Sequence, residues 1–82
     1  MINELNYFDE ELDTSGLLCP YPLLRAKKVL TNFPKGRILR VISTDPSSVI
    51  DFKAYTSISG NTLLGTRVSE GKYYFFIQKG EH

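Results

Sequence analysis

Cys19 is the single cysteine of this 82-residue chain, and it stands directly before Pro20-Tyr21-Pro22, which leads into a helical pattern. The first N–H groups of a helix lack intrahelical partners and together carry about half a positive charge. A cysteine in such a position can have its pKa lowered, and the thiolate is the nucleophilic form of the residue. We therefore expect a sulfur that is nucleophilic at neutral pH and is held outward on a turn stiffened by two prolines.

A second interpretation of Cys19 stays open, because a single cysteine in a small domain is often a buried packing residue. The basic side chains of Arg25, Lys27 and Lys28 would either add positive potential near the thiol or form a solvated helix face. Asp13 and Asp51 are expected to orient the loop before the thiol or to pair with Arg25 or Lys27, and not to act in catalysis.

One cysteine and one histidine also limit the chemistry of the chain. A single thiol excludes an intrachain disulfide, and a cysteine-rich zinc site would have only His82 as a soft partner. No histidine stands beside Cys19 as a general base. We expect no metal and a reducing, cytoplasmic setting.

Composition removes several classes of function. Ten Lys and Arg against nine Asp and Glu leave a net charge of +1, and 41% of the residues are hydrophobic. Disorder is therefore not expected, and electrostatic binding to duplex nucleic acid has little support. No apolar run approaches the roughly 20 residues of a membrane span, and the start of the chain shows no signal peptide. We expect one domain over residues 1–82, in which residues 1–6 are a loose lead-in.

The elements that must position Cys19 follow the order strand, helix, strand, helix, strand, strand. Hydrophobic spacing and turn residues place them at residues 7–13, 22–33, 37–43, 45–60, 62–69 and 72–79. In the first helix the apolar side chains recur at three- and four-residue steps, at Leu23, Ala26, Leu30 and Phe33. The second helix is expected to begin with Asp45 as its N-cap and Pro46 at its first position. Ile50, Ala54 and Ile58 share one face of this helix, and Val49 and Phe52 lie adjacent to that face. The pair Glu70-Gly71 predicts a two-residue hairpin loop, and Lys79-Gly80 a solvated terminus.

The element order predicts an α/β two-layer sandwich. Two strand–helix–strand steps predict two parallel strand pairs, and right-handed crossovers put both helices on one face of a four-stranded mixed sheet. In the last strand, alternation sends Tyr73, Phe75 and Ile77 to one side. Tyr74 and Phe76 point to the other side, where no helix is expected to cover them.

The segment Leu12–Pro22 reads Leu-Asp-x-x-Gly-Leu-x-Cys-Pro-x-Pro and resembles the signature of the TusA/SirA-like sulfur-carrier family. The resemblance covers about residues 9–80. Its further matching positions are the basic helix, Gly36, Asp45-Pro46, Asp51, Gly60 and the closing strand Tyr73–Ile77 with Lys79-Gly80. Within the motif, the residues expected to support the cysteine are Asp13, Gly16, Pro20 and Pro22.

The resemblance implies a sulfurtransferase-type carrier that accepts a sulfane sulfur on Cys19 as a persulfide and passes it on. The implied donor is a cysteine desulfurase, and the implied acceptor is a protein of a sulfur relay serving tRNA 2-thiouridine synthesis or sulfur metabolism. Arg25, Lys27 and Lys28 are then expected to bind the partner, and the carrier is expected to be a monomer without a cofactor. Tyr21 and Asn61 depart from common family usage at positions that bear on partner choice.

Two other functions are compatible with the sequence. The chain could be a noncatalytic regulatory module that binds a protein through the open sheet face, and its function would then be indifferent to Cys19→Ser. Sheets with exposed aromatic side chains also bind RNA by stacking on bases, although the charge of +1 argues against this.

Overall fold

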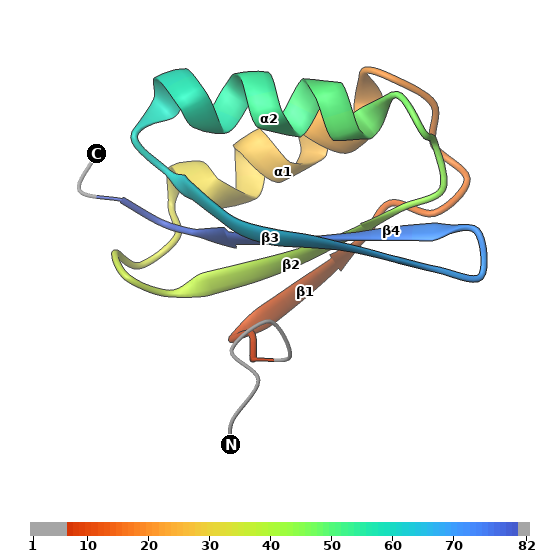
Figure 1. Cartoon of the computed structure of the whole chain (residues 1–82). Coiled ribbons are helices and arrows are strands. Elements are labelled where there is room, and N and C mark those ends of the chain that lie inside the picture. The colour runs from red at the N-terminus through yellow and green to blue at the C-terminus, as the bar shows by residue number, and fades with distance from the viewer. Residues whose placement is uncertain (1–6, 81–82) are drawn as a thin grey trace.

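The computed structural model of the chain describes residues 7–80, and these form a two-layer arrangement of a sheet and two helices (Figure 1). In chain order the elements are β1 (Glu10–Asp13), α1 (Tyr21–Thr31), β2 (Ile38–Ser43), α2 (Ser48–Ser59), β3 (Thr62–Ser69) and β4 (Lys72–Gln78). Both helices cover the same face of the four-stranded sheet, so the predicted fold class and element order are confirmed. The expected lead-in over residues 1–6 and His82 lie outside the described residues.

The strand order β1-β2-β4-β3 differs from the predicted pairing in one respect. Strands β1 and β2 pair in parallel, but β4 lies between β2 and β3 and is antiparallel to both. The second predicted parallel pair is therefore wrong, because the crossover through α2 passes over one strand position. The hairpin then returns β4 into this gap. Its loop residues Glu70 and Gly71 both have positive φ values, 49° and 77°, which is typical of the predicted two-residue turn.

The core lies between the helices and the inner face of the sheet. Helix α1 buries Ala26 and Leu30 at a four-residue step, as its sequence pattern predicts. From α2, Phe52 stacks on Phe75 of β4 with ring centroids 4.5 Å apart. Burying an aromatic ring removes more apolar area from water than burying an aliphatic side chain of α2, which favours the orientation that turns Phe52 inward.

Helix α2 begins later and faces differently than its sequence indicates. The helix starts at Ser48 with Ser47 at the N-cap, so the expected N-cap role of Asp45 is wrong. Residues before the helix instead form a turn in which the Ser48 N–H donates to the Asp45 carbonyl oxygen at 3.0 Å. With Phe52 in the core, the face shared by Ile50 and Ile58 turns to solvent, where these side chains are 73% and 85% exposed.

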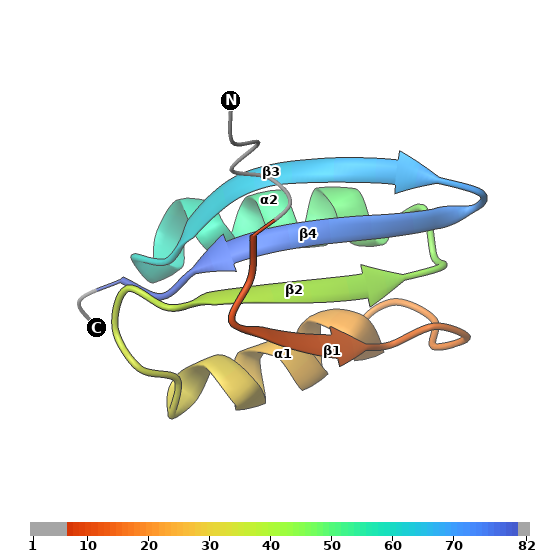
Figure 2. The ribbon, with the colours of Figure 1, turned by 90° about the horizontal axis from the view of Figure 1, so that it is seen from below.

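The sheet face opposite the helices is partly covered by the chain itself. Residues 7–9 cross this face before entering β1 (Figure 2), and the ring of Phe8 lies 6.5 Å from that of Phe76. Phe76 is consequently buried, although no helix packs against it. The Arg40 guanidinium lies 4.1 Å from the Phe8 ring centroid and 5.1 Å from that of Tyr74, which adds cation–π contacts to the cover.

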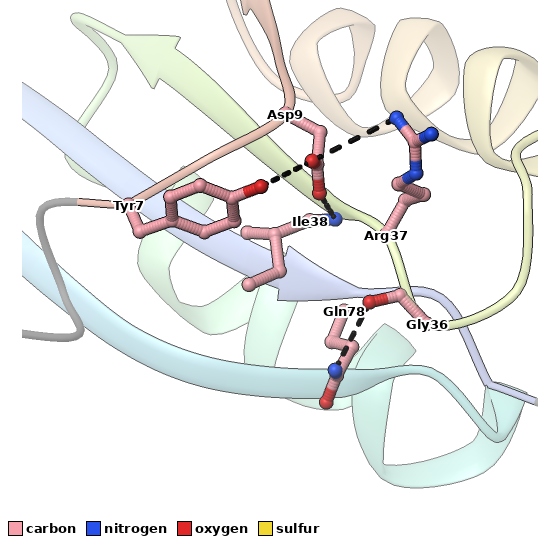
Figure 3. Close-up of polar contacts among 6 residues, drawn as sticks. All are labelled: Tyr7, Asp9, Gly36, Arg37, Ile38 and Gln78. Atoms are coloured by element: carbon pink, nitrogen blue, oxygen red, sulfur yellow. Dashed lines mark hydrogen bonds and ion pairs between the residues drawn. The ribbon is translucent and has the colours of Figure 1, made fainter.

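Asp9 attaches this covering segment to the sheet (Figure 3). Its carboxylate accepts hydrogen bonds from the Tyr7 hydroxyl at 2.6 Å and from the Ile38 N–H at 2.7 Å, and it faces Arg37 at 3.7 Å. The hydrogen bond from Tyr7, followed by that from Ile38, lowers the pKa of Asp9. Regular strand pairing begins only at Glu10, later than the expected start at residue 7.

Lys79 is not a solvated terminal residue, and that prediction is wrong. Its side chain is 8% exposed, and its ammonium donates to the carbonyl oxygens of Leu30 and Thr31 in the last turn of α1. A cation at this end of a helix meets the negative end of the helix dipole and satisfies carbonyls that lack intrahelical partners. Gly80 packs against the neighbouring loop so closely that a Cβ would meet the Gly60 carbonyl oxygen at 1.9 Å.

Substituting Lys79→Met should lower the free energy of unfolding by about 1–3 kcal/mol, because a similar side-chain volume would then leave buried carbonyl oxygens without their charged donor. Lys53→Met, on an exposed position of α2, is the matched control and should change stability little. Urea unfolding followed by circular dichroism measures both variants. Equal effects of the two substitutions would contradict the structural role of Lys79.

Candidate functional site

Cys19 lies at the edge of the sheet where the parallel strands β1 and β2 both end. The loop after β1 leads to α1, and the loop after β2 leads to α2, so the N-terminal ends of both helices gather at this edge (Figure 1). Loops at the carboxyl ends of parallel strands commonly carry the binding residues of α/β folds.

Three successive contacts fix the loop that carries the thiol. Thr14 is buried, and both its N–H and its hydroxyl donate to the Ile42 carbonyl oxygen in β2. The Gly16 N–H donates to the Thr44 hydroxyl at 2.9 Å. Gly16 also has a φ of 86°, in the left-handed region that L side chains rarely adopt. The loop therefore depends on the end of β2 for its shape.

The other motif residues stand at the two ends of this loop. Asp13 accepts a hydrogen bond from the Ser15 N–H at 2.9 Å, and the hydrogen bonds from Ser15 lower its pKa. Pro20 is the N-cap residue of α1, and its carbonyl oxygen accepts from the Leu24 N–H at 3.0 Å. Pro22 is buried in the first turn of α1, where its sequence placed it. These positions are compatible with the expected supporting roles, which stay predictions.

Cys19 itself is exposed, so it is not a core packing residue. Its N–H donates to Asp45 Oδ2 at 2.6 Å, and its Sγ donates to Asp51 Oδ2 at 2.8 Å. Asp45 comes from the loop after β2, and Asp51 lies in the first turn of α2. We call these two carboxylates the acidic pair. Asp45 accepts the hydrogen bond from the backbone of Cys19, and Asp51 accepts the hydrogen bond from its thiol.

The acidic pair reverses the expected electrostatics of the thiol. The pKa of Cys19 is raised, first by the hydrogen bond to Asp51 and further by the negative charges of Asp51 and Asp45. The nearby Ser47 side chain acts in the opposite direction and lowers the pKa. The prediction that the helix entrance lowers this pKa is therefore wrong, because removing the proton would leave a thiolate beside two anions.

The basic residues of α1 do not offset these carboxylates. Arg25, Lys27 and Lys28 are exposed, and Lys28 already lies in the last turn of the helix. The Lys27 ammonium lies 5.9 Å from the centroid of the Tyr55 ring in α2. None of the three is among the groups that shift the pKa of Cys19. The alternative in which Asp51 pairs with a basic residue of α1 is replaced by its bond to Cys19.

Sequence reasoning singled out Asp45 and Asp51 but missed that both contact Cys19. Asp45 precedes a proline and reads as a helix start, yet its Oδ1 accepts from the N–H and the hydroxyl of Ser47 while Oδ2 accepts from Cys19. These hydrogen bonds lower the pKa of Asp45, with that of Cys19 first, and so favour its charged form. Asp51 is 32 residues from the thiol, and only the arrangement of the two helices brings them together.

The two departures from family usage have different surroundings. Tyr21 follows the loop and is 57% exposed close to the thiol in sequence. Asn61 is buried, donates to the Tyr55 hydroxyl at 2.8 Å and accepts from the Gly80 N–H at 2.9 Å. Tyr21 is thus available to a partner, whereas Asn61 joins the end of α2 to the end of β4.

A second surface feature lies on the open face of the sheet. A shallow hollow there is lined by Arg40, Arg67, Val68, Ser69, Tyr74 and Phe76.

Neither helix of the described residues has the length and apolar character that crossing a bilayer requires. Within residues 7–80, no three His, Cys, Asp or Glu side chains gather as metal ligands.

The fold and the site together define a small α/β domain that presents one exposed thiol where two loops and two helix starts meet. Comparison with known proteins identifies its class: the profile of the family described as "Sulfurtransferase TusA" matches residues 10–79, and the chain belongs to this family. Membership supports a role as a sulfur carrier that interacts with sulfur donor and acceptor proteins.

Individual relatives agree with this assignment. The chain is 51% identical over 72 residues to the sulfur carrier protein TusA of Allochromatium vinosum, covering 88% of this chain and 95% of that protein. It is 35% identical over 71 residues to the sulfur carrier protein TusA of Pseudomonas syringae, covering 87% and 84% of the two chains. A crystal structure of a SirA-like protein from Desulfitobacterium hafniense has the same fold, with a TM-score of 0.77 at 24% identity, covering 89% of this chain and all of that one.

Proposed function

We propose that Cys19 carries the sulfur, as a persulfide accepted from a cysteine desulfurase and relayed to an acceptor protein. The observation that carries this proposal is the exposure of the only thiol of a TusA-family chain at the meeting point of two fixed loops. A thiol that must exchange sulfur with other proteins needs to reach their sulfur atoms, and an exposed position at the sheet edge allows this.

The transfer is an exchange at sulfur in which atoms and electrons balance. The sulfur of Cys19 attacks the terminal sulfur of the donor persulfide, a new S–S bond forms, and the S–S bond of the donor breaks. The donor sulfur leaves with the electron pair of that bond, and the proton of Cys19 passes to it directly or through solvent. The reverse set of bond changes, with an acceptor thiol as the attacking group, unloads the carrier.

The surroundings of the thiol favour a carrier over a self-sufficient enzyme. Cys19 faces carboxylates and a hydroxyl, and none of these groups is a histidine base. The sulfur is exposed at an edge, and a protein partner would supply the rest of the reaction site. We propose that the chain acts as a single domain in the reducing cytoplasm, where a free thiol persists, and that the relay serves tRNA thiolation or another sulfur pathway.

Replacing Cys19→Ser should abolish sulfur loading and leave the fold intact, since an exposed side chain of similar shape has little packing to lose. Mass spectrometry after incubation with a cysteine desulfurase, its cofactor and cysteine measures loading as the gain of one sulfur on the intact chain. The circular dichroism spectrum and urea midpoint of the variant control for folding. Persistent loading of a folded Cys19→Ser protein would show that another atom carries the sulfur.

Helix α1 is the proposed docking element for the donor. Arg25, Lys27 and Lys28 are exposed on it, and none of them is among the groups that shift the pKa of Cys19, so we expect them to bind a partner without changing the thiol. Charges at the rim of an interface act mainly on the association rate and its salt dependence. An acidic surface on the donor is the expected complement.

Reversing Lys27 and Lys28 to Glu should slow loading by the desulfurase, with a loss that shrinks as salt is added, because exposed charges are screened. Loading by a small-molecule persulfide donor should be almost unchanged in the same variant. Initial loading rates by mass spectrometry at two ionic strengths measure both effects. Equal losses with the protein donor and the small donor would contradict docking through α1.

A noncatalytic interaction module is the second candidate, and the hollow on the open face is the observation that favours it. Arg67 lies in this hollow, on the opposite side of the sheet from α1, so Arg67→Glu serves as the control for the reversal of Lys27 and Lys28. If Arg67→Glu abolished partner binding and Cys19→Ser left the biological output unchanged, this second function would replace the carrier.

A further inference from the structure

The hydrogen bond between Cys19 and Asp51 opposes ionisation of the thiol in the empty carrier. A thiolate is the reactive form of cysteine, yet here the thiol donates its proton to a carboxylate oxygen that lies 2.8 Å from Sγ. Asp51 belongs to α2, whose orientation is fixed by Phe52, the next residue in sequence, stacked in the core on Phe75. The Asp51 carboxylate therefore sits on a rigid element and not on a mobile loop.

The second carboxylate reinforces this arrangement from another element. Asp45 accepts the Cys19 N–H at 2.6 Å and is itself fixed by hydrogen bonds from Ser47 at 3.0 and 2.9 Å. The groups that face the thiol are therefore Asp51 from α2, Asp45 and the Ser47 hydroxyl from the preceding loop, and the N-terminal end of α1. Of these, Asp51 alone accepts the thiol proton in the described structure.

We propose that the Asp51 carboxylate keeps the empty carrier in its thiol form, so that Cys19 reacts slowly in free solution and accepts sulfur within a complex. This inference rests on the proposed function. A thiol is a poor nucleophile toward disulfides and oxidants, which protects the single sulfur between transfers. A donor that places a cation against Asp51 would weaken its hold on the proton and release the thiolate at the moment of transfer.

The hydrogen bond to Asp51 is lost when Cys19 carries a persulfide. In a persulfide the inner sulfur of Cys19 has no proton left to donate to Asp51, and the terminal sulfur lies one S–S bond, about 2 Å, further out. Asp51 thus acts on the empty form of the carrier, because the loaded form has no thiol proton on Cys19 for its carboxylate to hold.

The test is the pH dependence of alkylation of the empty protein by iodoacetamide. In Asp51→Asn the amide keeps the size of the side chain but removes its negative charge, so the midpoint of the rate profile should move to lower pH and the rate near neutral pH should rise. Asp51→Glu retains a carboxylate and should stay closer to the wild-type profile than Asp51→Asn. Glu10→Gln, which removes one exposed charge at the far end of β1, is the matched control and should leave the profile unchanged.

An Asp51→Asn profile that superimposes on those of the wild type and Glu10→Gln would overturn the inference. Equal shifts in Asp51→Asn and Asp51→Glu would also overturn it, because the effect would then follow the shape of the side chain and not its charge. Circular dichroism of each variant confirms folding before alkylation is measured. The experiment needs no sulfur donor, so its result is independent of whether the desulfurase loads Cys19, which the mass-spectrometric experiment decides separately.

Discussion

The hydrogen bond from the Cys19 N–H to the Asp45 carboxylate joins the two loops on which the site depends. One loop leaves β1 and the other leaves β2, and because these strands are parallel neighbours, both loops emerge at one edge of the sheet. Nearer to the sheet, the contacts of Thr14 with Ile42 and of Gly16 with Thr44 also hold the two loops together. The position of the thiol is thus a consequence of strand pairing more than of the helix that follows it.

Two opposing electrostatic effects meet at the sulfur, and geometry decides between them. The positive end of a helix favours a thiolate, but its charge is spread over several N–H groups and is reduced by solvent at an exposed site. The carboxylate of Asp51 is a full charge at hydrogen-bond distance from Sγ, and Asp45 adds a second charge nearby. The short-range interaction prevails, and the thiol keeps its proton more firmly than an unperturbed cysteine does. The site consequently stabilises the thiol form of Cys19 and not its thiolate.

Local signals in the sequence were sufficient for much of the fold. The spacing of Ala26 and Leu30 predicted the buried face of α1, and Glu70-Gly71 predicted the hairpin, because each pattern depends on neighbours along the chain. The place of β4 between β2 and β3 and the buried ammonium of Lys79 could not be predicted in this way. Both arise from contacts between distant segments, and the apolar run of β4 was equally compatible with an edge or a centre position.

The candidate site was also predictable only where it depends on local sequence. Cys19 and its flanking prolines were found from one short motif, whereas the contact with Asp51 requires α2 to be oriented by the burial of Phe52.

The most direct measurement of the protonation of Cys19 is a pH titration of its Cβ resonance by nuclear magnetic resonance in the empty, specifically labelled protein. A midpoint above that of the same cysteine in a peptide of residues 15–22 is the result that the Asp51 hydrogen bond predicts. A midpoint at or below the peptide value would contradict the account, because the helix entrance would then govern the thiol.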